Sequence, residues 1–118
     1  MPRSITTEAG RAALAAVRDA ETPARTDLAT AVRYLLQLLT EKAPGNTVEV
    51  RIPPFGAVQV VQGPRHTRGT PPNVVETDAV TWIALATGAE PWPAAVASGR
   101  VHASGSRADL ADLLPLNP

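Results

Sequence analysis

The chain has 118 residues, 44% of them hydrophobic, and its formal net charge is zero because 11 Lys and Arg balance 11 Asp and Glu. This length fits one domain with one core, and the balanced charge argues against the broad basic surface that binds nucleic acid. Cysteine is absent, which excludes disulfides and thiolate-bound metals and favours a cytoplasmic location. No run of about 18 apolar residues could span a membrane, and we expect no signal peptide.

The first half begins with two predicted helices. Residues 7–20 carry Ala at helical spacing, which predicts an Ala-rich helix that buries little. Pro23 ends this helix, which belongs to the N-terminal segment of residues 1–25. A second helix is expected over residues 26–43, with Thr26 as its N-cap. Its apolar positions recur as they do in a helix that faces a core.

Strands follow these helices. Residues 47–52 alternate strictly between apolar and polar side chains, so Val48, Val50 and Ile52 should share one buried face. The Pro53-Pro54 pair interrupts the pattern, and residues 55–61 read as the second strand of a hairpin. A short strand is expected over residues 73–76.

The second half alternates helices and a strand. Asp78 should cap a helix that ends at Gly88, and a short helix should run from Trp92 to Ser98. Residues 100–104 fit a last strand, and the segment from Ser106 resembles the start of a C-terminal, leucine-bearing helix. This order predicts an α+β fold in which helices cover one face of a mostly antiparallel sheet.

A longer pattern of residues spans the last third of the chain. It starts as Val-Val-Glu-Thr-Asp-x-x-Thr-Trp-x-x-Leu-x-x-Gly at Val74 and continues through Ser98-Gly99-Arg100-Val101 to Gly105 and Leu110. This string resembles the sterol carrier protein family, in its bacterial form, and the likeness is closest over residues 74–114. The resemblance implies a single sterol-carrier-like domain over residues 1–118, with five strands under a layer of helices. It also implies an apolar tunnel that takes sterols, fatty acids or acyl-coenzyme A in some members.

The first hypothesis is therefore a non-enzymatic lipid-binding module without a cofactor. A loop of locally positive character would hold the head group of the ligand, through Arg65, His66 and Arg68. The apolar chain would be enclosed by Leu35, Leu38, Val58, Val60, Trp82, Ile83, Leu85 and Val96. The same loop also fits a plain solvated turn, and Trp82 also fits an ordinary core residue.

A second hypothesis has no ligand. Large apolar side chains are few. Small Ala side chains could leave a cavity, but the backbone can equally close over them and fill the interior. The protein would then be an accessory domain, like the one attached to certain bacterial thiol-dependent isomerases, and would contact another protein or a second copy through the first helix or residues 63–72.

Neither catalysis nor metal binding has a convincing set of residues. Glu76 and Asp78 stand at a strand-to-helix junction, where one solvated carboxylate and one helix cap are the simpler interpretation. His102 fits a structural histidine. The sequence contains no nucleophile elbow, no phosphate-binding glycine loop and no pair of histidines at metal-ligand spacing.

Overall fold

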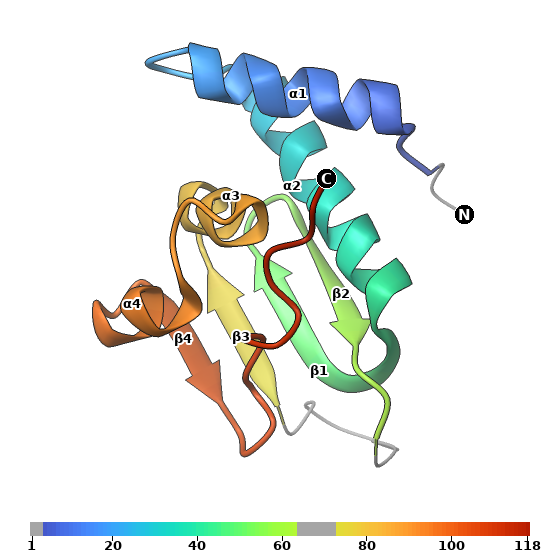
Figure 1. The fold of residues 1–118 in the computed structure, drawn as a ribbon, viewed down its shortest axis with the longest axis vertical. Helices are drawn as coiled ribbons and strands as arrows, with labels where there is room; N and C mark the ends of the chain where they lie inside the picture. Colours follow the sequence, from blue (N-terminus) through green and yellow to red (C-terminus); the bar gives the residue numbers. More distant parts are fainter. Residues whose placement is uncertain (1–3, 64–72) are drawn as a thin grey trace.

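The computed structural model describes residues 4–63 and 73–118. Within these residues the chain has the predicted α+β composition, with four helices and four strands (Figure 1). The elements in chain order are α1 (Thr7–Asp19), α2 (Arg25–Lys42), β1 (Pro44–Ile52), β2 (Gly56–Val60), β3 (Val74–Thr77), α3 (Ala79–Thr87), α4 (Trp92–Ala97) and β4 (Val101–Ser104).

In the described part of the chain the sheet has fewer strands than the five expected, and it is antiparallel in two of its three strand pairs. The described residues form four strands in the order β2-β1-β3-β4. The two outer pairs are antiparallel, but β1 and β3 at the centre are parallel. The hairpin returns the chain to the end of the sheet where β1 begins, and β3 starts from that same end on the other side of β1. Strand β3 must therefore run parallel to β1. The sequence patterns of the separate strands do not indicate this direction.

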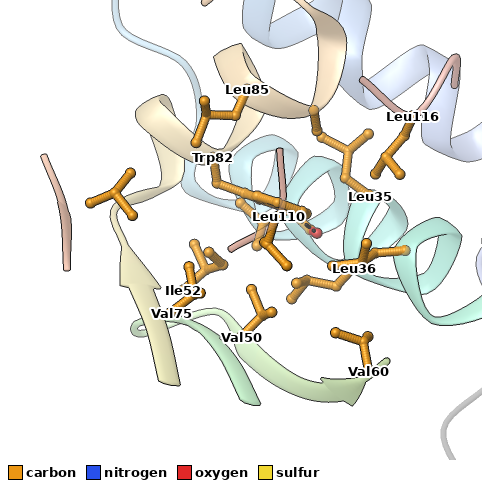
Figure 2. Close-up of a cluster of buried hydrophobic side chains, with 14 of the residues drawn as sticks. Leu35, Leu36, Val50, Ile52, Val60, Val75, Trp82, Leu85, Leu110 and Leu116 are labelled. Carbon is orange, nitrogen blue, oxygen red and sulfur yellow. Dashed lines mark hydrogen bonds between the residues drawn. The ribbon is translucent and has the colours of Figure 1, made fainter. Parts of the chain in front are cut away.

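One face of the sheet carries the core. The alternation in β1 places Val48, Val50 and Ile52 on this face, as predicted, and all three are fully buried. The core side chains of α2 and α3 lie over them, and Figure 2 shows Trp82 and Leu110 in the middle of this cluster. The other face carries polar residues such as Glu49 and Arg51, which are partly exposed.

The helix ends follow local chemistry at most positions. The Asp78 carboxylate accepts a hydrogen bond from the Thr81 N–H at 2.7 Å, and Gly88 ends α3 in the left-handed conformation at φ 87°. Both predictions are confirmed. The predicted N-cap of α2 is wrong, because the helix begins at Arg25 after Ala24 and Thr26 lies inside its first turn.

The predicted C-terminal helix is also wrong, because the residues from Ser106 onward form turns and extended chain. Pro115 cannot donate an N–H and disfavours helical geometry at the residue before it. The Asp109 side chain accepts a hydrogen bond from the Ala111 N–H, closing a local turn in place of a capping box. Leu110 is nonetheless fully buried, so this segment helps to cover the sheet without being helical.

Candidate functional site

The predicted ligand-binding residues that the structure describes do not gather around one cavity. Four of them belong to the packed core and are at most 2% exposed, namely Leu35, Val60, Trp82 and Leu85. Three are half-buried at the edge of the core, namely Leu38, Val58 and Ile83. Val96 on α4 is 39% exposed. Arg65, His66 and Arg68 lie outside the described residues.

Trp82 occupies the place where a tunnel between helices and sheet was expected. It is the largest fully buried side chain among the described residues, and its indole N–H donates to the Val32 carbonyl of α2 at 3.3 Å. Figure 2 shows its ring between α2, α3 and the strands, with Leu35 and Leu110 close by. The described interior is thus filled at this point, as the core interpretation of Trp82 expected.

A groove of about 560 Å³ lies instead at the β2 edge of the sheet, between β2 and α2. Three segments of the chain line it: the residues before α1, one face of α2 and the start of β2. The apolar part of the lining comes from Ile5, Leu36, Phe55 and Val58. Its volume is within the range of small-molecule sites, and it is open to solvent along one side.

Positive charge collects at the Phe55 end of the groove. The Arg33 Nε–H donates to the Phe55 carbonyl at 2.8 Å, and the Arg25 guanidinium lies 5.6 Å from the centre of the Phe55 ring. Arg33 is the charged residue among the described residues that line the groove. An anionic group at this end would meet the Arg33 guanidinium, and Arg25 adds a second positive charge on the Phe55 ring.

The segment before α1 is attached to α2 by a pair of hydrogen bonds. The Gln37 side-chain amide accepts from the Ile5 N–H at 2.8 Å and donates to the Ile5 carbonyl at 2.9 Å. Both main-chain polar groups of Ile5 are therefore satisfied by one side chain of α2. This clamp holds the segment before α1 beside the groove.

Sequence reasoning missed these groove residues apart from Val58. Thr30, Arg33 and Gln37 recur at helical spacing and so share one face of α2. That polar stripe beside an apolar face was the available signal. Its partners Ile5 and Phe55 are distant in sequence, so the stripe alone could not reveal a groove.

The outer face of the sheet carries the remaining candidates. Glu76 is paired in register with both Arg51 and His102, and the Arg51 guanidinium contacts Glu49 at 2.9 Å. This hydrogen bond to Glu49 raises the pKa of Arg51. Among the described residues no group of three or more His, Cys, Asp or Glu could hold a metal ion.

The residues that carry the family resemblance have structural contacts. Arg100 forms an ion pair with Glu90, and its carbonyl accepts the Thr77 hydroxyl at 2.7 Å. Val101 is buried. These residues therefore determine how α3, α4 and β4 are connected. A family recognised by this pattern is recognised by its fold and not by a binding site.

Residues 24–116 match the family described as "bacterial SCP ortholog". The chain belongs to this family. No curated protein gives a significant match to it. The match to the bacterial sterol-carrier-like family begins after α1, and it includes α2, the β2 edge and the arginines of the groove, but not Ile5.

Proposed function

We propose that this sterol-carrier-like protein binds one apolar or amphipathic ligand without catalysing a reaction. The observation that carries the proposal is the groove between α2 and β2, with apolar side chains along it, Arg33 in its lining and Arg25 over the Phe55 ring. The family membership suggests a lipid. A fatty acid or acyl-coenzyme A would place its chain against Leu36 and Val58 and its negative group near Arg33.

In this proposal the groove takes the place of the internal tunnel that the resemblance implies. A tunnel would need space where Trp82 and its neighbours pack, whereas the groove needs no rearrangement of the core. None of the helices in residues 4–63 and 73–118 is long and apolar enough to span a membrane. The cysteine-free sequence fits a cytoplasmic site of action, and this remains a prediction.

A second candidate function is that of an accessory interaction domain with no small ligand. The filled core around Trp82 favours it. The Ala-rich α1, which lies before the matched residues, would then be available for contact with another protein or a second copy.

Two variants on the same strand test the groove. A Cβ on Gly56 would lie 3.4 Å from Leu36 Cδ1, an ordinary contact, so Gly56→Phe fits the backbone and extends a ring into the groove. Gln59 belongs to the opposite, exposed face of β2 and is not among the described residues that line the groove. Gln59→Phe is therefore the matched control.

Native mass spectrometry reports the outcome. The protein is incubated with palmitate, palmitoyl-coenzyme A and a sterol, and stoichiometric adducts are counted. We expect an adduct with the wild type and with Gln59→Phe, and its loss with Gly56→Phe. A bare mass in all cases would refute ligand binding, and an adduct that survives in Gly56→Phe would place the ligand elsewhere.

A further inference from the structure

The β2 edge of the sheet has main-chain groups without a partner strand in the described structure. β2 is the outermost strand and pairs with β1 on one side only. The Glu49 N–H donates to the Asn73 carbonyl on the far side of β1. Because main-chain groups alternate along a strand, Val50 then faces β2, and its partner Val58 faces β1.

The same alternation turns the main-chain groups of Ala57 and Gln59 outward. Both residues are exposed, and no main-chain hydrogen bond of either is found among the described residues beyond those of the strand itself. Strand edges in native proteins are often protected by a charged residue, especially Lys, or by Pro. β2 reads Gly-Ala-Val-Gln-Val and has none of these.

This open edge borders the groove. Val58 points to the inner face and, with Leu36 of α2, supplies an apolar surface beside the edge. A peptide that adds to a sheet edge needs a main-chain ladder for affinity and pockets for alternate side chains for specificity. The edge of β2 offers the first, and the groove offers the second.

We propose that this edge binds the extended C-terminal segment of a partner protein, which pairs with β2 in the antiparallel direction. Charge complementarity identifies the end of the peptide, because Arg33 and Arg25 lie beside Phe55, immediately before β2. A strand antiparallel to β2 ends at that position, so its terminal carboxylate meets the guanidinium groups. An aliphatic side chain near the end of the peptide contacts Leu36 and Val58.

This inference goes beyond the proposed lipid binding and does not depend on it. Peptide and lipid would use the same apolar surface, so the two ligands exclude one another. A bound peptide would displace palmitate from the groove.

The test uses a library of random octapeptides displayed with free C-termini and selected on the full-length protein. Ala57→Pro removes one outward N–H, and proline is tolerated in edge strands at such positions. Ala57→Ser keeps that N–H and is the matched control. Each selected peptide is also synthesised with a C-terminal amide, which changes the ligand without any risk to folding.

We expect selected peptides to share an aliphatic residue near the C-terminus. Amidation should weaken binding roughly tenfold or more, and Ala57→Pro should weaken it roughly threefold to tenfold, with Ala57→Ser unchanged. Failure to select any peptide would overturn the proposal. So would selected peptides that bind equally well as amides, or a dimer of the protein that pairs two β2 edges. Lipid adducts in the absence of peptide binding would leave the proposed function standing and remove only this inference.

Discussion

Replacement of Trp82 by alanine should strongly destabilise the protein. The indole is 1% exposed, and an aromatic side chain buries roughly 150–250 Å². At about 25 cal/mol per Å² this corresponds to roughly 4–6 kcal/mol, and large-to-small changes at buried aromatic residues cost about 3–5 kcal/mol. We therefore expect Trp82→Ala to lower the free energy of unfolding by about 4 kcal/mol.

Urea denaturation followed by circular dichroism measures this loss. With an m-value of about 2 kcal/mol per M, the midpoint should fall by about 2 M. Trp82→Phe keeps most of the ring but loses the hydrogen bond to Val32, so it should cost less, about 1–2 kcal/mol. It gives a measurable value even if the alanine variant does not fold.

Val80 on the same helix is the control. It is 71% exposed, so Val80→Ala should change stability by less than about 0.5 kcal/mol. A loss below about 1 kcal/mol in Trp82→Ala would refute the packed interior, and a tunnel beside α3 would then have to be considered again.

Three further variants test how the helices are held. Asp78→Ala should cost about 1 kcal/mol in chemical denaturation, because the Thr81 N–H loses its cap, and an unchanged midpoint would contradict this role. Gly88→Ala should cost about 1–2 kcal/mol because φ is 87° there, whereas an equally stable variant would argue against the left-handed helix end. In Gly10→Val the new Cβ would overlap the Tyr34 ring, so α1 should separate from α2 and become sensitive to trypsin; wild-type resistance would show that α1 packs differently.

Local chemistry made much of the fold predictable. The strict alternation in β1 identified its buried face, and Asp78 and Gly88 marked both ends of α3, because a cap and a left-handed glycine depend on neighbouring residues only. The prediction of a helix after Ser106 was wrong for the opposite reason. This segment is attached by a long-range hydrogen bond from the Leu116 N–H to the Ala86 carbonyl, and Leu110 is buried without helical periodicity.

The groove depends on contacts that no local pattern contains. Ile5 and Gln37 are 32 residues apart, and Arg33 and Phe55 are 22 residues apart. Sequence reasoning instead placed the ligand against large apolar residues, and core residues such as Leu35 and Trp82 share that character. Of the predicted site residues that the structure describes, Val58 is the one that also lines the groove.

A titration of the ¹⁵N-labelled protein with laurate, followed by two-dimensional NMR, would test the central claim most directly. The Trp82 indole N–H gives a separate signal and reports on the core, while Ile5, Leu36 and Val58 report on the groove. We expect saturable shifts at the groove residues and an unchanged Trp82 indole signal. Shifts centred on Trp82 and Leu85, with the groove signals unmoved, would contradict it.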